Sequence, residues 1–193
     1  GSGKSLHIQN AANYLKKRKI SFIRIREPGG SKNAEKIRKL ILNNKSKFNK
    51  NTDLLLYLAA RSENVENIIK KNYKKRVILI DRFTDSTFAY QHYGMGVDKG
   101  IIQLINNYIL KRINVSFTFL HIVNEKNLKH RLLKRKVLNR YDKFKYSFYK
   151  KVQKGFVNRA RLNKKKYLTI NSNIEINKNK KIIINKINKI LNI

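Results

Sequence analysis

Runs of β-branched and other apolar residues alternate with segments of helical spacing along the whole chain. The apolar runs have the length of buried strands and lie at Ser21–Ile25, Val77–Ile80, Ser116–Val123 and Tyr167–Ile170. The segments between them predict helices at Ser5–Lys17, Asn33–Asn43, Thr52–Lys71, Thr84–Asn107, Glu125–Lys134, Asp142–Asn163 and Lys180–Leu191. This alternation favours an α/β domain with a mostly parallel sheet that helices cover on both faces.

The chain has 193 residues, enough for one domain with a buried core, and no linker rich in proline or glycine divides it. We therefore expect a single domain over residues 1–193. No apolar run reaches about 18 residues, so we expect no contact with a membrane through a spanning helix. The chain contains no cysteine, which excludes disulfides and thiolate metal sites and is typical of a cytoplasmic protein.

The formal net charge of +35 raises the question of a nucleic-acid partner. The lysines are spread along the whole chain and mixed with asparagine and isoleucine, as in Lys45–Asn51 and in the tail after Ile176. A binding patch would instead be a concentrated stripe with aromatic or arginine anchors. We expect solvated basic faces that attract polyanions non-specifically, and no specific nucleic-acid site.

The first five residues, Gly1, Ser2, Gly3, Lys4 and Ser5, match the second half of the phosphate-loop pattern G-x-x-x-x-G-K-[ST]. In that pattern, backbone N–H groups surround phosphate oxygens at a helix N-terminus, where the helix dipole favours anions. Lys4 would reach the outer phosphates of a nucleotide, and the Ser5 hydroxyl would hold Mg²⁺. Gly-Ser pairs also occur in linkers, so this motif alone is a weak signal.

Charged residues follow two of the expected strands, at the sheet edge where open α/β domains bind ligands. The segment Arg26–Gly30 combines a proline with two glycines that permit a sharp turn close to a ligand. Asp81 ends the next strand where a phosphoryl-transfer site places a Mg²⁺ ligand, and Arg82 beside it can bind a phosphate through two hydrogen bonds. An ordinary turn explains the proline and glycines of the first segment well, but Arg26 and Glu27 less well. For Asp81 taken alone, capping of a turn is an equally good explanation.

Two helical segments carry side chains that can recognise a nucleobase. Tyr57 and Arg61 share a helix face and can hold a flat ring between an aromatic and a guanidinium group. The polar groups that could read a pyrimidine edge and a sugar lie at helical spacing and are Ser86, Thr87, Tyr90 and Gln91. For the first pair, a core tyrosine and a solvated arginine are the alternative interpretation.

A basic stretch follows the third expected strand and contains His130, Arg131, Lys134, Arg135 and Arg140. Arg131 and Arg135 lie one helical turn apart, and arginines on a lid stabilise the charge of a phosphoryl group in transfer. A solvated basic run explains this stretch equally well. The four histidines of the chain are scattered and lack metal-ligand spacing.

Taken together and in this order, the motifs resemble those of bacterial thymidylate kinase, the P-loop enzyme that phosphorylates dTMP to dTDP. The most specific segments are Arg26–Gly30 followed by Ala34–Arg38, then Ala59–Arg61, then Asp81-Arg82 followed by Ser86-Thr87, Ala89–Gln91 and Gly94. The resemblance runs nearly end to end. It implies a P-loop nucleoside-monophosphate-kinase fold, ATP as phosphate donor, Mg²⁺, a homodimer with the Tyr57 helix as a candidate interface, and a lid over about residues 130–141.

The resemblance also implies roles for single residues. Those expected at ATP and Mg²⁺ are Gly1, Ser2, Gly3, Lys4 and Ser5, with Asp81 as the second metal ligand. Those expected at dTMP are Glu27 near the sugar and metal, Arg38 and Arg82 on the phosphate, Tyr57 stacked on thymine, Arg61 and Thr87 at its edge, Tyr90 at the 2′ position, and Ser86 and Gln91 beside them.

Members of this family carry the catalytic arginine either in the phosphate loop or in the lid. Gly1 occupies the loop position of the first type, so the chain resembles the lid type, with Arg135 as the candidate and Arg131 as the second choice. Lys4 and Arg82 complete the expected catalytic set. In this family an acidic residue and a central strand precede the position of Gly1, and we expect the chain to lack both.

Without a central strand, two neighbouring strands would hold unpaired backbone groups, each at a cost of about 1–3 kcal/mol. We therefore expect the 193-residue chain to be a poor kinase. Two other interpretations stay open. One is another nucleoside-monophosphate kinase of the same fold, and the other is a non-catalytic basic protein that binds nucleic acid on a degraded kinase scaffold.

Overall fold

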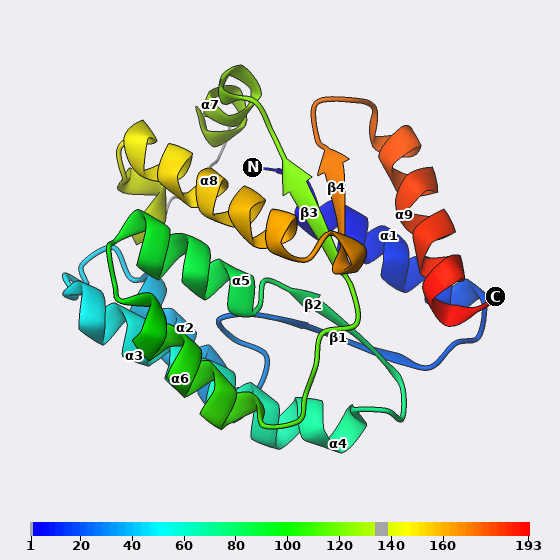
Figure 1. The fold of residues 1–193 in the computed structure, drawn as a ribbon, viewed down its shortest axis with the longest axis horizontal. Helices are drawn as coiled ribbons and strands as arrows, with labels where there is room; N and C mark the ends of the chain where they lie inside the picture. The colour runs from blue at the N-terminus through cyan, green and yellow to red at the C-terminus, as the bar shows by residue number, and fades with distance from the viewer. Residues whose placement is uncertain (1, 134–138) are drawn as a thin grey trace.

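The computed structural model describes residues 2–133 and 139–193, whose strands and helices are arranged as in Figure 1. The four strands, each paired in parallel with one other, are β1 (Phe22–Arg26) with β2 (Val77–Asp81), and β3 (Thr118–Ile122) with β4 (Tyr167–Asn171). Every strand expected from the sequence is present within two residues of its expected ends. The apolar runs therefore located the strands correctly.

The parallel sheet is present as two separate halves, as expected for a chain without the central strand. Within the described residues, no backbone pairing joins β2 to β3. A cavity of about 1560 Å³ reaches both of these inner strands and is lined by every residue of each, including Leu79 and Phe119. The inner edge of each half, at β2 and at β3, therefore has no strand partner among the described residues, and both inner edges face the same cavity.

Two helices cover one face of both halves and connect them. They are α1 (Lys4–Lys17) and α9 (Ile176–Leu191). Leu15 of α1 and Ile183 of α9 belong to one apolar cluster with Leu79 of β2 and Ile170 of β4. Because this cluster contains residues of both strand pairs, side-chain packing holds together two halves that have no backbone hydrogen bonds between them.

A second apolar cluster lies on the other face of β1 and β2. It is built mainly from α3 (Lys50–Asn64), its π-helical continuation η1 (Val65–Ile69) and α6 (Lys99–Leu110). Ile78 and Ile80 of β2 contact this cluster, whereas Val77 and Leu79 contact the α1 side. A strand that is buried on both faces needs an apolar residue at each position, which explains this continuous run.

The remaining elements are α2 (Lys32–Leu42), α4 (Lys70–Asn72), α5 (Thr84–Thr87), η2 (Phe88–Gly94), α7 (Glu125–Leu133), η3 (Arg140–Lys143), α8 (Tyr146–Leu162) and η4 (Lys164–Lys166). The expectation of one helix over Thr84–Asn107 is wrong. The chain turns after η2 and starts again at α6, because Gly96 adopts a φ of +72° and Asp98 caps α6 by accepting from Ile101 N–H at 2.9 Å.

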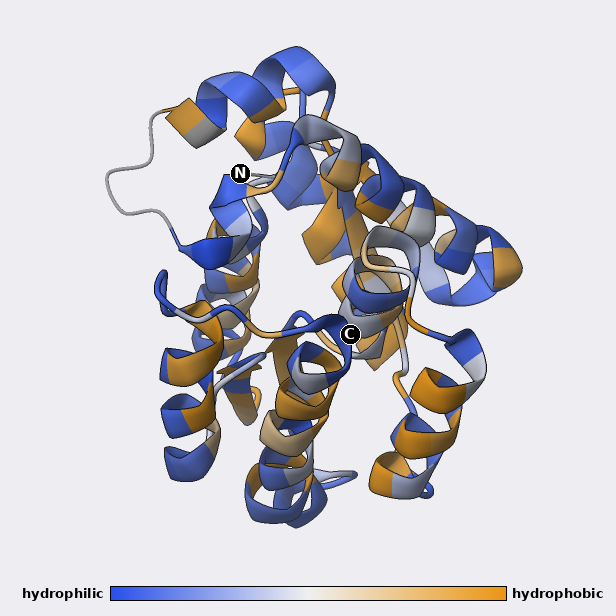
Figure 2. Ribbon diagram, turned by 90° about the vertical axis from the view of Figure 1, so that its left-hand side faces the viewer, coloured by the Kyte–Doolittle hydropathy of each residue, from blue (hydrophilic) through white to orange (hydrophobic). Residues whose placement is uncertain are grey.

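Two other helix boundaries differ from expectation. The helix expected from Asp142 begins as α8 at Tyr146, because residues 140–143 form a separate turn that Asn139 caps. Helix α9 begins before the expected Lys180, because Asn179 Nδ2 donates to the Asn171 carbonyl at 2.9 Å and docks the first turn on β4. The helices carry bands of hydrophilic and hydrophobic residues (Figure 2), and none in the described ranges is suited to cross a membrane.

Candidate functional site

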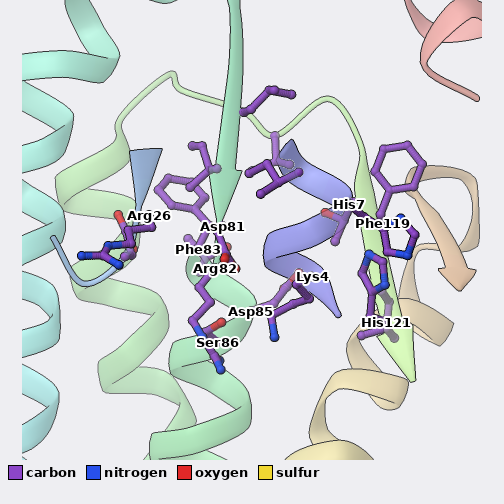
Figure 3. Close-up of a pocket in the computed structure, with 18 of the residues that line it drawn as sticks. Lys4, His7, Arg26, Asp81, Arg82, Phe83, Asp85, Ser86, Phe119 and His121 are labelled. Carbon is purple, nitrogen blue, oxygen red and sulfur yellow. The ribbon is translucent and has the colours of Figure 1, made fainter. Parts of the chain in front are cut away.

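The carboxyl ends of β1 and β2 meet at one edge of the sheet, where charged residues face the cavity (Figure 3). Arg26 is in register with Asp81, and Glu27 N–H donates to the Asp81 carbonyl at 2.9 Å. Gly29 and Gly30 follow with φ of +120° and +119°, in the region that favours glycine. The structure thus brings together two segments that are more than fifty residues apart in the sequence.

The start of α1 lies at the same edge and carries the phosphate-loop residues. Ser5 Oγ donates to Asp81 Oδ2 at 3.1 Å, and Lys4 Nζ donates to Ser2 Oγ at 3.1 Å. The second oxygen, Asp81 Oδ1, is buried and has no hydrogen-bond partner in the described part of the chain. A hydroxyl beside such an oxygen fits Mg²⁺, which takes oxygen ligands and retains several waters. Gly1 lies outside the described residues.

Three arginines line the cavity near this edge: Arg26, Arg38 and Arg82. Burial lowers the pKa of Arg38, and the charges of Arg26 and Arg82 lower it further, because like charges close by disfavour the protonated form. Two of the three share one carboxylate, Glu35, which lies 3.9 Å from Arg26 and 4.0 Å from Arg38. An anion between these groups would replace repulsion by attraction, so the cluster suits a phosphate.

Arg82 has an unusual backbone and a defined aromatic neighbour. Its φ of +69° is uncommon for any residue other than glycine, and such conformations gather at functional sites. Its guanidinium carbon lies 5.1 Å from the centre of the Tyr90 ring, and the interaction with Tyr90 is the main cause that raises the pKa of Arg82. The charge of Arg82 is therefore held in place next to Tyr90.

Arg61 and Glu27 form a buried ion pair. Arg61 is 1% exposed and Glu27 is 4% exposed. Arg61 donates to Glu27 Oε2 from Nε at 2.9 Å and from Nη2 at 2.7 Å, and to Asn106 Oδ1 from Nη1 at 2.7 Å. Burial raises the pKa of Glu27, against the opposing charge of Arg61. Both residues line the cavity as expected, but each is anchored by the other, and this pairing was not expected.

A second buried network joins α3 to η2 and η3. The carboxylate of Asp53 accepts from Gln91, Tyr141 and Arg140. The Tyr141 ring lies edge-on to Tyr57, with ring centres 5.9 Å apart. Sequence analysis missed Asp53 and Tyr141. The one available signal was spacing, because Asp53 precedes Tyr57 by one helical turn on the face that also carries Arg61.

The polar row on α5 and η2 is only partly at the cavity. Ser86, Tyr90 and Gln91 line it. Thr87 is buried and is absent from the residues that line the cavity. The hydroxyl of Thr87 and the amide oxygen of Gln91 are buried without hydrogen-bond partners in the parts that the structure describes. Buried polar atoms of this kind are costly unless a ligand or water satisfies them.

Two arginines of the basic stretch bond to different parts of the protein. Arg131 Nη2 donates to the Ser172 carbonyl at 2.8 Å, and Arg140 pairs with Asp53. Lys134 and Arg135 lie outside the described residues. Arg131, the second choice for a catalytic arginine, therefore bonds to the loop after β4, and the position of the first choice stays a prediction.

Two histidines that the sequence left without a role lie beside the phosphate loop (Figure 3). His7 of α1 and His121 of β3 are stacked, with ring centres 5.2 Å apart. Burial, with smaller effects of the charges of His7 and Lys4, lowers the pKa of His121 to about 4. Burial also lowers the pKa of His7. Both rings are therefore neutral at pH 7 and add no further positive charge near Lys4.

Comparisons with known proteins agree along nearly the whole chain. A family model with the description "Thymidylate kinase" matches residues 1–183. The thymidylate kinase of Acholeplasma laidlawii is 34% identical over 192 residues, which cover 98% of this chain and 94% of that protein. The thymidylate kinase of Wolbachia sp. subsp. Brugia malayi is 33% identical over 193 residues, with coverage of 98% and 91%.

A solved structure is similar as well. The crystal structure of thymidylate kinase from Ehrlichia chaffeensis matches with a TM-score of 0.78 and 28% identity, over 97% of this chain and 92% of that one. This likeness confirms the fold that was expected from the order of the motifs.

Proposed function

This chain belongs to the thymidylate kinase family, and we propose that its cavity holds dTMP and ATP with their phosphates facing one another. The reaction of the family is phosphorylation of dTMP to dTDP with ATP as donor, and this chain is a kinase of that reaction. The observation that supports the site is the shared sheet edge, where Ser5 bonds to Asp81 and where Lys4, Arg38 and Arg82 line the same cavity.

The phosphate groups of the two substrates would meet at this edge. Lys4 would neutralise the outer phosphates of ATP, and Arg38 and Arg82 would bind the dTMP phosphate, with Arg26 as a third cation. Ser5 and Asp81 would hold Mg²⁺. When bound, Mg²⁺ neutralises charge that develops on the phosphate oxygens. The chain's own groups supply positioning and charge stabilisation, which account for most of the catalysis in phosphoryl transfer.

The nucleoside would lie between the aromatic residues and the η2 row. Tyr57 would stack on thymine, Gln91 and Ser86 would bond its polar edge, and Tyr90 would crowd the 2′ position. Arg61, held in place by its pair with Glu27, would form one wall of this site. The guanidinium edge that does not bond to Glu27 would face the base. Thr87 stays a candidate for the base edge, although it does not line the cavity.

The catalytic arginine would come from a lid over about residues 130–141, with Arg135 as the first candidate. One side-chain contact at each end of that segment supports the proposal. Arg131 is bonded to Ser172, and Arg140 is bonded to Asp53. The first anchor ties Arg131 to the protein, which favours Arg135 as the residue that reaches the transferring phosphate.

The cavity between the edges of β2 and β3 suggests that a further strand belongs there. In the part of the chain that the structure describes, the inner edges of β2 and β3 lack a strand partner, and the cavity between them is lined by apolar residues such as Leu79 and Phe119. We propose that an extended apolar strand leading into Ser2 fits there and completes the phosphate loop. Paired strand edges and added backbone N–H donors would raise both stability and turnover.

A chain extended before Gly1 by an apolar strand, a glycine and two or three residues ending in Asp or Glu tests this point. The control extension carries the same residues in scrambled order with a proline in the strand. We expect only the first to raise the midpoint of thermal unfolding and dTMP-dependent ATP consumption. Turnover on the order of 1–100 s⁻¹, typical of kinases, by the unextended chain would contradict the proposal.

An exposed apolar face on α6 and α3 suits a homodimer. Leu104 is 70% exposed and Tyr108 is 78% exposed on α6, with Ile101 one turn earlier, and Leu55 on the neighbouring α3 is 57% exposed. We propose that a second copy covers this face, in the cytoplasm, where a cysteine-free nucleotide kinase would work. Sedimentation of the Leu104→Asp variant should then give a monomer, and a dimer would contradict this interface.

The function itself is tested by comparing phosphate acceptors. The strand-extended chain with ATP and Mg²⁺ should form ADP in step with dTDP when dTMP is supplied. We expect dUMP to be a weaker acceptor and UMP and dGMP to be poor ones, because Tyr90 and the η2 row are shaped for a deoxypyrimidine. Equal rates with all four nucleotides, or ATP consumption without an acceptor, would contradict the proposal.

A further inference from the structure

Asp53 is a buried carboxylate that joins three elements around the cavity. It is 1% exposed and lies in the first turn of α3. Its Oδ2 accepts from Gln91 Nε2 at 3.0 Å and from the Tyr141 hydroxyl at 2.5 Å, and its Oδ1 forms an ion pair with Arg140. Asp53 therefore fixes one residue of η2 and two residues of η3 relative to α3.

The contact with Asp53 decides which way round the Gln91 amide lies. An ionised carboxylate has no hydrogen to donate, so only the NH₂ group of Gln91 can face it. The other amide atom, Gln91 Oε1, is buried and has no hydrogen-bond partner within residues 2–133 and 139–193. Gln91 is itself 1% exposed and lines the cavity. The site thus contains an oriented acceptor that lacks a donor.

The same carboxylate controls the aromatic side of the pocket. The Tyr141 ring, held through its hydroxyl by Asp53, lies 5.9 Å from the centre of the Tyr57 ring and 5.8 Å from that of Tyr90. Tyr57 and Tyr90 line the cavity together with Gln91. One side chain therefore supports both the rings and the amide that surround the same space.

We propose that Asp53 is a positioning residue that keeps the Gln91 oxygen toward the base and so selects pyrimidines whose ring N3 carries a hydrogen. Thymine and uracil have an N3–H donor, whereas N3 of neutral cytosine is an acceptor. The N3–H group of thymine or uracil can donate to Gln91 Oε1. Cytosine would instead place its N3 acceptor against the acceptor Gln91 Oε1. A site built to bond one polar group rejects an analogue without it, because its own buried group then stays unpaired.

This inference rests on the proposed function, since it takes the base to lie beside Tyr57 and Gln91. Calorimetric titration of dTMP and dCMP into the wild-type chain, Asp53→Asn, Gln91→Ala and the double variant tests it. We expect the wild type to favour dTMP by about tenfold to a hundredfold, the range that an unpaired buried polar group produces. Asparagine can offer either an oxygen or an NH₂ group, so in Asp53→Asn the Gln91 amide can turn and the preference should fall about tenfold.

The double variant separates positioning from general support of the structure. If Asp53 acts through Gln91, the double variant keeps the preference of Gln91→Ala alone, because the two substitutions remove one interaction. A merely structural role would lower both affinities together and leave their ratio unchanged. Asp98→Asn is the matched control, since Asp98 caps α6 on its own and Asp and Asn cap helices about equally well.

An unchanged dTMP to dCMP ratio in folded Asp53→Asn, or effects on the ratio that add in the double variant, would overturn the inference. If Asp53→Asn does not fold, Asp53→Asn with Arg140→Gln takes its place, because it removes the cation that would be left unpaired. Turnover is measured separately. Absence of dTMP-dependent ADP formation by the strand-extended chain would contradict the proposed function, whereas the binding ratio would still test Asp53.

Discussion

The two ends of the cavity that we propose for the nucleoside and for the phosphates, called here the nucleoside end and the phosphate end, differ in how their charges are balanced. At the nucleoside end, Arg61 is paired with Glu27 and Arg140 with Asp53, and the carboxylates of both pairs are almost fully buried. Each of these cations has its own carboxylate within the protein. The charges of these two arginines are therefore balanced without a ligand.

At the phosphate end the balance is different. Arg26 and Arg38 share Glu35 at 3.9 and 4.0 Å, and the charges of Arg26 and Arg82 help to lower the pKa of Arg38. Like charges held together cost stability, and a bound anion removes that cost. The comparison indicates that the nucleoside end supports the fold, whereas the phosphate end is shaped for its ligand at the expense of the fold.

The largest expected effect comes from breaking the nucleoside end. Arg61→Ala leaves Glu27 buried without its cation, which typically costs about 3–5 kcal/mol of stability. Urea unfolding should show this loss, and KM for dTMP should rise far more than KM for ATP. Arg112→Ala, at an exposed position, is the control. A loss below about 1 kcal/mol, the range of surface pairs, would mean that the buried pair does not support the fold.

Removing Lys4 tests the opposite behaviour at the phosphate end. In the strand-extended chain, Lys4→Ala should lower kcat by about a hundredfold to a thousandfold, as loss of a preorganised electrostatic group does. The midpoint of thermal unfolding should stay near that of the parent chain. Lys17→Ala, exposed at the other end of the same helix, should leave both quantities unchanged. Near-parental turnover of Lys4→Ala would refute the phosphate-loop assignment.

Low pH tests the phosphate end further, because protonation of His121 adds a positive charge near Lys4. The pKa of His121 is about 4 in the folded chain and 6.5 in its ordinary state, so the unfolded chain takes up the proton first as pH falls. Stability from this group is therefore full above pH 6.5 and is lost between about pH 6.5 and 4, by at most about 3 kcal/mol. In His121→Gln the urea unfolding midpoint should change less with pH in that window than in the wild type. The same dependence on pH in both chains would count against this account.

The smallest effect concerns one arginine of the phosphate cluster. Arg38→Gln should weaken dTMP binding by about tenfold, because it removes charged hydrogen bonds to the phosphate. Its thermal midpoint should hold or rise, because Arg26 and Arg82 lose a like-charged neighbour. Titration calorimetry and thermal unfolding measure the two quantities, with the exposed neighbour Lys39→Gln as control. A clear fall in the midpoint would show that Arg38 supports the fold.

Local pattern was enough to predict much of the fold. The two strands were expected from continuous apolar runs to end at Ile25 and Ile80, one residue before their observed ends at Arg26 and Asp81. Parallel pairing then placed both ends at one edge, as the register confirms. The break between η2 and α6 was missed because helical periodicity continues through Gly96. A single glycine with a left-handed φ and the cap at Asp98 overrode that periodicity.

Site residues that belong to a sequence motif could be predicted. Site residues that depend on pairing between distant parts of the chain could not. Lys4, Ser5 and Asp81 were grouped into one expected site from motifs, and the hydrogen bond of Ser5 to Asp81 brings them together. The pairing of Arg61 with Glu27 joins residues 34 positions apart, and that of Asp53 with Tyr141 joins residues 88 positions apart. No local spacing carries information of that kind, so these roles became visible only in the folded chain.

The central claim is that the cavity recognises dTMP through two ends of different physical character. Titration calorimetry of dTMP and of thymidine, which lacks the phosphate, at low and high salt tests it most directly. Salt shortens the screening length from about 10 Å at 0.1 M to about 3 Å at 1 M. The account predicts that high salt weakens binding of dTMP and leaves that of thymidine unchanged. Equal salt dependence for both ligands, or no loss for dTMP, would contradict it.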